Sequence, residues 1–313
     1  ERLVESLAGS GRFDVAHVEH MRGVALASRV RGLPVVFDAV DSISALFAET
    51  AAHGPSAAGR LLARLDLGRS RRFEARAPFA FTRLVVTTRQ EADAFLDLAG
   101  PGAAPRVEVV GHGVDVDYFQ PAASDAGGAV VLTGKLSYHA NTAAALRLVQ
   151  RIMPEVWKVV PDTPVILAGK DPPPAVQALA RDARVRVPGF VDDMRAVFAQ
   201  AAVAACPLVY GRGVQNKVLE ALASGVATVM TEAPSRAFSG VPGRHYLVAD
   251  DDRTFAASLV ELLRDGDLRR RLGRAAREYV VAHHGWERSV AALVEVYRTA
   301  RGEFAEGRGP QQQ

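Results

Sequence analysis

The fold is decided by a short apolar run that leads through a glycine-rich turn into a helical pattern. The sequence reads Ala202-Val-Ala-Ala-Cys206, followed by Pro207-Leu-Val-Tyr-Gly-Arg-Gly-Val-Gln-Asn-Lys-Val-Leu-Glu-Ala-Leu-Ala-Ser-Gly225. The first run is typical of a buried strand, and the apolar residues of 215–224 recur with helical spacing. A strand that passes through such a turn directly into a helix is the repeating unit of a parallel α/β sheet.

The same alternation extends in both directions along the chain. Strands are expected at 14–18, 33–37, 84–88, 107–110, 129–133, 164–168, 185–187, 202–206 and 227–230. Helices are expected near Glu91 and at 141–160, 174–182, 192–200, 215–224, 252–265, 267–282 and 286–300. Thr88 is in the right place to cap the helix near Glu91.

Breaker residues at 121–128 predict a linker between two domains. We therefore expect an incomplete Rossmann-like domain at 1–122 and a second Rossmann-like domain at 123–285. A helix at 286–301 is expected to pack back toward the first domain, and residues 302–313 are expected to form a frayed tail.

Length and composition set the class of protein. The chain has 313 residues, of which 49% are hydrophobic and 23% charged, as in a globular protein of about two domains. The single cysteine, Cys206, excludes an internal disulfide and a multi-cysteine metal site. Since neither a membrane-spanning apolar run nor a signal peptide is found, we expect a cytoplasmic protein.

Seven arginines are concentrated in one stretch, where only Asp66 and Glu74 oppose them, although the net charge of the chain is only +3. They are Arg60, Arg64, Arg69, Arg71, Arg72, Arg76 and Arg83. Such a cluster suits phosphate, an anionic membrane surface or simply a solvated helix face. Aromatic residues are not interleaved among them, so nucleic-acid binding is not expected.

The glycine-rich turn has the features of an anion site. Gly211 and Gly213 allow backbone amides to approach a ligand, and the following helix N-terminus offers free N–H groups and partial positive charge. Lys217 adds a formal charge, and the Glu220 carboxylate one turn later is suited to accept hydrogen bonds from ribose hydroxyls. The alternative is an ordinary βα turn followed by a surface Lys–Glu pair.

Two other strand ends carry similar candidates. Lys135 follows the strand at 129–133, where it either holds a phosphate or is an exposed turn lysine; the surrounding sequence is not a P-loop. Gly189 and Phe190 follow the strand at 185–187, where they either border a nucleobase or fill the turn. The histidines lack zinc-binding spacing, so no metal site is expected; His20 is either catalytic or structural.

Four segments follow one another in this order: Val109-Val-Gly-His-Gly-Val-Asp-Val-Asp-Tyr-Phe-Gln-Pro121, Leu132-Thr-Gly-Lys-Leu-Ser-Tyr-His-Ala-Asn141, Val187-Pro-Gly-Phe-Val-Asp-Asp193 and Arg212-Gly-Val-Gln-Asn-Lys-Val-Leu-Glu-Ala-Leu-Ala223. Together they resemble the family-4 retaining glycosyltransferases of the GT-B fold, in particular the bacterial sugar transferases of exopolysaccharide gene clusters. The resemblance implies two domains with parallel sheets facing a cleft. It also implies retaining transfer from a nucleoside-diphosphate sugar to a glycan or lipid-linked acceptor, without an obligatory metal or other cofactor.

The resemblance assigns roles to individual residues. The expected catalytic residues are His20, Asp41, Lys135 and Lys217. The expected donor-binding residues are Lys135, Gly189, Phe190, Gly213, Val214, Gln215, Asn216, Lys217 and Glu220. Among these, Glu220 is expected on the donor ribose, and Lys135 and Lys217 on the diphosphate.

The sequence departs from the family pattern in ways that leave alternatives open. Arg212 stands where the first motif glutamate usually lies, and a cation there suits an acidic donor sugar. The family's opening strand and glycine-rich loop are not found, so we expect a truncated N-terminal domain and a chain inactive by itself. A nucleotide-sugar 2-epimerase and a non-catalytic nucleotide-sugar-binding subunit remain as alternative functions. Peripheral contact with an anionic membrane at the inner face of the cell membrane is a further expectation.

Overall fold

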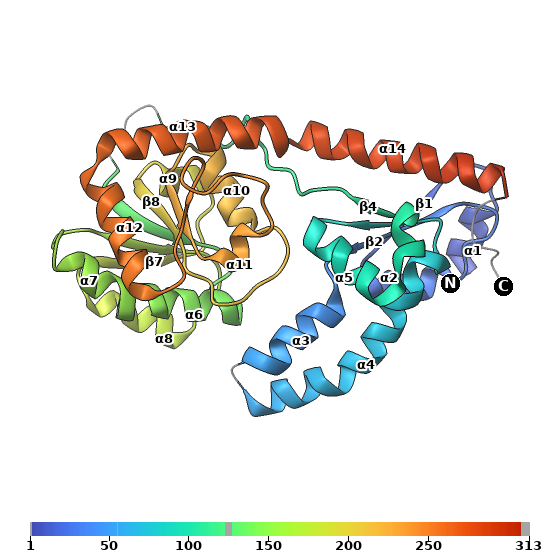
Figure 1. The fold of residues 1–313 in the computed structure, drawn as a ribbon, viewed down its shortest axis with the longest axis horizontal. Helices are drawn as coiled ribbons and strands as arrows, with labels where there is room; N and C mark the ends of the chain where they lie inside the picture. The colour runs from blue at the N-terminus through green and yellow to red at the C-terminus, as the bar shows by residue number, and fades with distance from the viewer. Residues whose placement is uncertain (1, 55, 123–126, 308–313) are drawn as a thin grey trace. The chain divides into compact units, whose positions relative to one another are not determined.

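A computed structural model describes residues 2–54, 56–122 and 127–307 of the chain (Figure 1). The chain divides into two compact units. Unit 1 comprises the residues up to His112 and those from Glu287 onward, and unit 2 runs from Gly113 to Trp286. The division therefore lies before the expected boundary at residue 122.

The segment after residue 112 belongs to unit 2 because its backbone is bonded there. The Val114 N–H donates to the His284 carbonyl at 2.7 Å. The Arg277 guanidinium donates to the carbonyls of Val116 and Phe119. Part of the expected linker (123–126) and part of the expected tail (308–313) lie outside the described residues.

Unit 1 contains a four-stranded parallel sheet in the order β1-β2-β3-β4. The strands are β1 (Ala16–Glu19), β2 (Val35–Val40), β3 (Arg83–Val86) and β4 (Val107–Val109). The helices are α1 (Arg2–Ala8), α2 (His20–Ala27), α3 (Ile43–His53), α4 (Ala57–Ala80), α5 (Arg89–Ala99) and α14 (Trp286–Ala305), with a 3-10 helix at Pro101–Arg106. As expected, Thr88 caps α5, its hydroxyl accepting from the Glu91 N–H at 3.1 Å.

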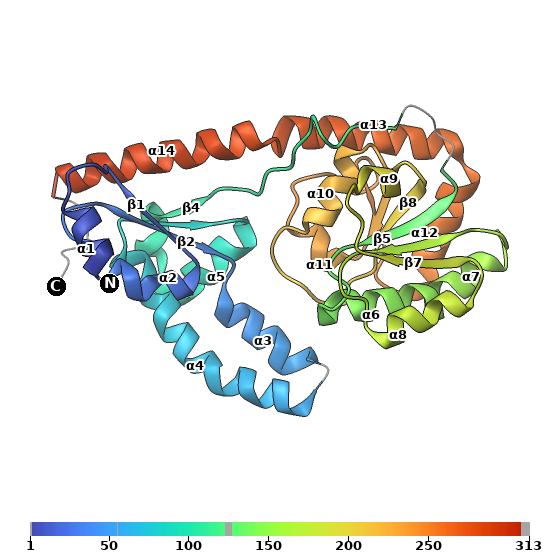
Figure 2. The ribbon, with the colours of Figure 1, turned by 180° about the vertical axis from the view of Figure 1, so that it is seen from behind.

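Both faces of the unit 1 sheet are covered. Because side chains alternate along a strand, neighbouring residues of β2 enter different cores. Phe37 packs with Leu84 and Phe95 in one core, while Val36 packs on the other face with Val296 of α14. The helix α14 runs along this sheet (Figure 2) and continues through Ala305, past the expected end at residue 301.

Unit 2 contains a six-stranded sheet in the order β10-β9-β8-β5-β6-β7, again with all pairs parallel. The strands are β5 (Ala129–Thr133), β6 (Val165–Ala168), β7 (Val185–Gly189), β8 (Ala201–Cys206), β9 (Thr228–Met230) and β10 (Leu247–Val248). The helices are α6 (His139–Arg147), α7 (Met153–Trp157), α8 (Pro174–Gln177), α9 (Arg195–Phe198), α10 (Asn216–Ala223), α11 (Glu232–Ser235), α12 (Asp252–Arg264) and α13 (Gly266–His283). A 3-10 helix at Ala178–Arg181 follows α8.

The helix expected over 141–160 is not continuous. The helix α6 ends at Arg147, a π-helical turn spans Leu148–Ile152, and α7 then begins at Met153. Pro154 has no N–H, so the regular i to i−4 ladder cannot pass through this position. The π-helical turn accommodates the proline while Leu148 and Ile152 stay buried in the core.

Candidate functional site

The predicted turns of unit 2 lie at one edge of its sheet. The strands β8, β5, β6 and β7 are consecutive neighbours in a parallel sheet, so their carboxyl ends meet at the same edge. The turn after β5 carries Lys135, the end of β7 carries Gly189, and the turn after β8 leads into α10. Ligands of open α/β sheets bind beyond this edge.

The ends of β5 and β6 contact each other through their backbones. The Gly134 N–H donates to the Ala168 carbonyl at 3.0 Å, and a Cβ on Gly169 would lie 1.7 Å from the Gly134 oxygen. Gly169 also has a φ of +152°. No side chain is therefore tolerated at Gly169, and the backbones of the two strand ends contact each other directly there.

An asparagine joins the two predicted lysine positions. The Lys217 ammonium, in the first turn of α10, donates to the Asn141 side-chain oxygen. The Asn141 amide nitrogen donates in turn to the Lys135 carbonyl at 2.9 Å. Burial lowers the pKa of Lys217. Asn141 thus fixes both the ammonium and the turn that presents the exposed Lys135 side chain.

The N-terminus of α10 has unused hydrogen-bond donors. Gln215 is its N-cap residue, but no side chain caps this end. Within residues 2–54, 56–122 and 127–307, the N–H groups of Val214, Gln215 and Asn216 donate no hydrogen bond. Gly213, just before them, has a φ of +69°. Free donors at a helix N-terminus favour an anion.

Glu220 lies farther along α10 and is half-buried. Burial raises the pKa of its carboxyl group. Nothing in the described part of the chain bonds to this carboxylate, whereas the Glu220 carbonyl accepts from the Ser224 hydroxyl at 2.8 Å. A half-buried carboxylate without a partner has its hydrogen-bonding capacity available for ligand hydroxyls.

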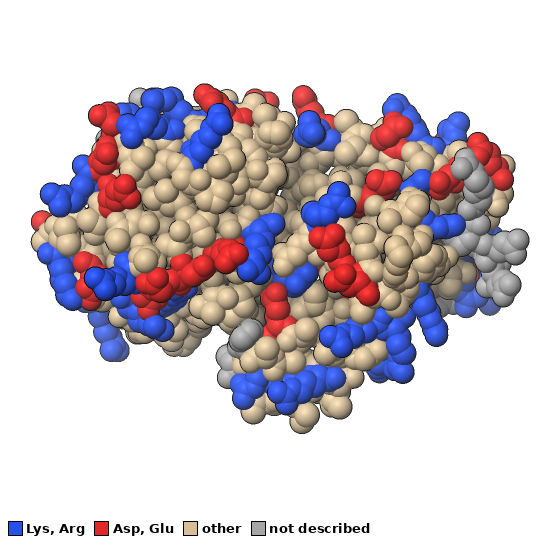
Figure 3. Space-filling model, viewed as in Figure 1, with Lys and Arg blue, Asp and Glu red and all other residues tan. Residues whose placement is uncertain are grey.

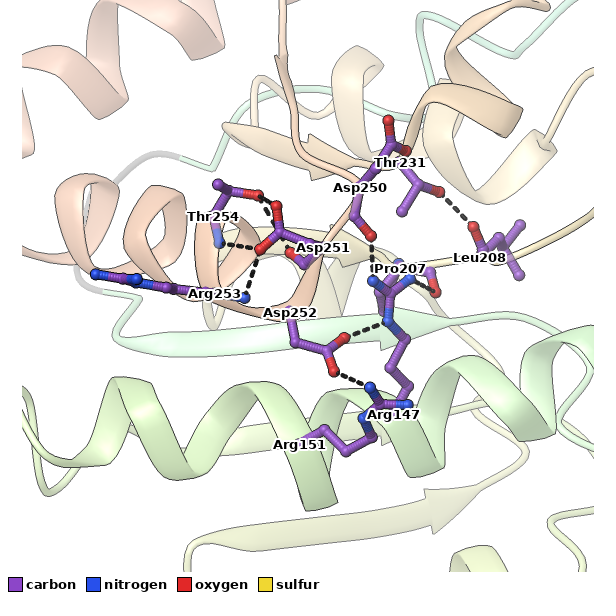
Figure 4. Close-up of polar contacts among 10 residues, drawn as sticks. All are labelled: Arg147, Arg151, Pro207, Leu208, Thr231, Asp250, Asp251, Asp252, Arg253 and Thr254. Carbon is purple, nitrogen blue, oxygen red and sulfur yellow. Dashed lines mark hydrogen bonds and ion pairs between the residues drawn. The ribbon is translucent and has the colours of Figure 1, made fainter.

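The base of the glycine-rich turn is held by Arg147 (Figure 4). Its Nε lies 2.6 Å from an Asp252 carboxylate oxygen, and its guanidinium also donates to the Pro207 carbonyl at 3.2 Å and to the Asp250 carbonyl. The Thr231 hydroxyl donates to the next carbonyl, that of Leu208. These bonds hold the backbone where the turn leaves β8.

A histidine and a tyrosine hold the middle of the turn. The Tyr210 hydroxyl lies 2.8 Å from His139 Nδ1, and the two rings stack with their centroids 5.4 Å apart. Burial lowers the pKa of His139 and raises that of Tyr210, so both stay uncharged near neutral pH. The pair connects the turn to the start of α6. Sequence analysis missed both residues.

The end of β7 presents an aromatic ring beside a lysine. Phe190 is 58% exposed, and Lys170 Nζ lies 4.7 Å from its ring centroid. The Gly189 carbonyl accepts from the Gly169 N–H at 2.8 Å. Lys170 is another cation at this edge that sequence analysis did not select, although its position just after β6 was a usable signal.

The two candidates of unit 1 also follow strands, at neighbouring positions in its sheet. His20 begins α2 with a φ of +59°, and its exposed imidazole Nε2 lies 3.6 Å from the Glu19 carboxylate. Asp41 follows β2 and accepts from the Thr87 hydroxyl at 3.2 Å. The structure thus holds Asp41 by a hydrogen bond and leaves the His20 side chain largely in solvent.

The described residues contain no group of three or more His, Cys, Asp or Glu side chains placed to hold a metal ion. Asp115 and Asp117, which have a metal-like spacing, belong to a turn. The Asp115 carboxylate accepts from the N–H groups of Asp117 at 3.1 Å and Tyr118 at 2.8 Å. Its role in the structure is therefore to stabilise that turn.

Known proteins match this chain over unit 2 and beyond. Residues 127–265 match the family described as glycosyl transferases group 1. The D-inositol 3-phosphate glycosyltransferase of Salinispora arenicola is 30% identical over 263 residues, which cover 73% of this chain and 56% of that protein. The alpha-maltose-1-phosphate synthase of Mycolicibacterium smegmatis is 29% identical, with coverage of 62% and 57%. The chain spans little more than half the length of these relatives.

Solved structures extend the likeness to both units. The Anabaena protein Alr3699/HepE, in complex with UDP and glucose, superposes with a TM-score of 0.72 at 14% identity, covering 96% of this chain and 82% of that one. The chain has the GT-B fold. The two parallel sheets of this GT-B chain confirm the expected fold class. In unit 2, Lys135 follows β5, and α10 carries Lys217, Glu220 and the free N-terminal amides described above.

Proposed function

We propose that this GT-B chain forms the two domains of a family-4 retaining glycosyltransferase. It moves a sugar from a nucleoside-diphosphate sugar to a glycan or lipid-linked acceptor, as in cell-surface polysaccharide synthesis. The observation that carries the proposal is the half-buried, unpartnered Glu220 on the helix whose N-terminal amides are free. The match of residues 127–265 to glycosyl transferases group 1 supports it.

The donor lies across the carboxyl ends of the unit 2 strands in this proposal. Glu220 accepts hydrogen bonds from the ribose hydroxyls. The diphosphate lies against the amides of Gly213 to Asn216, with Lys135 and Lys217 as its cations. The base lies by Gly189 and Phe190, where the exposed ring offers one face. The UDP bound to the Anabaena neighbour supports a nucleotide ligand for this fold.

Breaking the glycosidic bond places negative charge on the departing diphosphate. Cations and amides held in position before the reaction stabilise that charge without reorganising. Asn141 holds Lys217 in this way, and the bonds of Arg147 hold the turn that precedes α10. Charge-assisted hydrogen bonds to phosphate are stronger than hydrogen bonds between uncharged groups. These groups therefore supply the main stabilisation of the transition state.

The acceptor side of the reaction belongs to unit 1 in this proposal. His20 and Asp41 follow β1 and β2, which are neighbours in the sheet, and both are assigned to acceptor activation. No metal is required, because lysines and amides take the role of charge stabilisation. The protein would act in the cytoplasm, at the inner face of the cell membrane when its acceptor is lipid-linked.

The decisive test is donor binding by the Glu220→Ala variant of the full-length protein. Because the ribose loses its acceptor, affinity for the nucleotide sugar that stabilises the wild type should fall about 100-fold by calorimetry. Glu261→Ala, which removes an exposed glutamate of α12, should bind normally. Unchanged affinity in Glu220→Ala would remove Glu220 from the site, and binding without turnover in the wild type would favour a non-catalytic binding subunit.

A further inference from the structure

The outer face of α4 begins with an apolar patch. Leu61, Leu62 and Leu65 are 58%, 61% and 66% exposed. They lie near the start of a helix that forms a hairpin with α3 and extends away from the sheet of unit 1 (Figure 1). Neighbouring leucines exposed to this extent in one helical turn mark an interaction surface.

The same face continues as a basic stripe. From Leu61 the spacing of four, four, three and four residues leads through Leu65 to Arg69, Arg72 and Arg76, which places all five side chains on one side of the helix. The three arginines are exposed. Lys and Arg side chains gather on the lobe that carries α4 (Figure 3). We call these five residues together with Leu62 the α4 stripe.

Of the two acidic residues of α4, Asp66 is exposed but is not part of the stripe, whereas Glu74 is turned away from the surface. Glu74 is fully buried, and its carboxylate accepts from the Ser42 hydroxyl at 2.9 Å and the Ser44 N–H at 3.0 Å. Arg83, expected as a member of the arginine cluster, is also removed from the surface. It lies in β3, buried, with the Glu303 carboxylate 2.6 Å away.

We propose that the α4 stripe docks on an anionic lipid bilayer. The leucines enter the boundary between headgroups and acyl chains, while the arginines bind lipid phosphates and keep their charge at the surface. In the described part of the chain no helix is long and apolar enough to cross a membrane, so this contact is peripheral. The inference goes beyond the proposed transfer reaction, because none of the donor-binding residues is in unit 1.

Other occupants fit the stripe less well. A nucleic acid would pair with the arginines but leave the three leucines in water. A second copy of the chain, packed through the same face, would set arginines against arginines or against leucines, and neither arrangement supplies them with an opposite charge. A bilayer interface accepts both kinds of side chain at once.

The test is flotation of the full-length protein with vesicles of phosphatidylglycerol and phosphatidylcholine, compared with phosphatidylcholine alone. We expect binding only to the anionic vesicles, weakened by high salt. Arg69→Glu, Arg72→Glu and Arg76→Glu combined should lower partition about 100-fold. The matched control, Arg253→Glu, Arg264→Glu and Arg271→Glu, changes the same charge at exposed positions of unit 2 and should float like the wild type.

The leucines separate a bilayer from a purely electrostatic surface. Leu61→Ser with Leu65→Ser should lower partition about tenfold although every arginine remains. Equal flotation of the stripe variants and the control would overturn the proposal, as would stripe-dependent dimerisation or nucleic-acid binding without vesicle binding. Donor-induced thermal stabilisation, measured on the same variants, should not change, so failure of the membrane proposal and failure of the transferase proposal are distinguishable.

Discussion

The carboxylates beside the start of α3 in unit 1 are hydrogen-bonded, whereas that of Glu220 in unit 2 is not. In unit 1, Glu74 and Glu91 are fully buried and fully engaged: Glu91 accepts from the Ser42 N–H at 2.6 Å, and Glu74 accepts from Ser42 and Ser44. In unit 2, the half-buried Glu220 has no partner within the described residues. The paired carboxylates hold the start of α3 in place, whereas the unpaired carboxylate of Glu220 in α10 keeps its hydrogen-bonding capacity unused. The comparison separates carboxylates with a structural role from one without a partner within one chain.

The largest expected effect concerns the cations of unit 2. Lys217→Met, which keeps the apolar stem, and Lys135→Ala should each lower turnover by about 10²–10³, because each removes a cation that the proposed mechanism places against the leaving diphosphate. Release of nucleotide from the full-length protein, in the presence of donor and acceptor, measures this turnover. Lys158→Ala removes a lysine that only pairs with Glu155 on the surface and should be neutral. Wild-type turnover in both site variants would show that these lysines are structural charges.

The next effect is on the stability of unit 1. Glu74→Ala leaves the buried donors of Ser42 and Ser44 without an acceptor and should cost about 3 kcal/mol. Urea unfolding should show the loss in the transition of unit 1 and leave that of unit 2 in place. Asp66→Ala, on the exposed side of the same helix, should change the free energy of unfolding by less than about 0.5 kcal/mol. If Glu74→Ala lowers the free energy of unfolding no more than Asp66→Ala does, the hydrogen bonds of Glu74 do not hold the α3–α4 hairpin.

The smallest effect concerns Glu220 in the absence of donor. Burial raises its pKa, so folding favours the protonated carboxyl group, and the wild type loses this stability as the pH rises through the raised pKa. Glu220→Gln never ionises, so at about pH 8 it should melt on the order of 1–2 °C above the wild type, with little difference near pH 4. A variant that melts below the wild type at high pH would mean that the carboxylate has a stabilising cation in the free protein.

The βα units of unit 2 were predictable because their signals are local. The strand at 129–133 was predicted residue for residue, and α10 to within one residue at each end, since apolar runs and glycines mark both. The hairpin of α3 and α4 was not located. The exposed Leu61, Leu62 and Leu65 place apolar residues on the outer face, which weakens the periodicity that normally reveals a helix.

The supporting residues of the site could not be predicted from local patterns. Asn141 meets Lys217 across 76 positions, and Arg147 meets the Pro207 carbonyl across 60. Such contacts depend on which strands become neighbours in the sheet, and an isolated polar residue in a helix gives no sign of its distant partner. Glu220 and Lys217 were selected because they follow a glycine-rich turn, whereas Asn141 has no such marker.

The backbone contact between Gly169 and Gly134 limits how this chain can be redesigned. Because even an alanine methyl group at Gly169 would overlap the Gly134 carbonyl oxygen, a saturation library at this position should return glycine alone. Changes to the proposed donor site must therefore use side chains that are already exposed, such as Phe190, and leave Gly169 as it is.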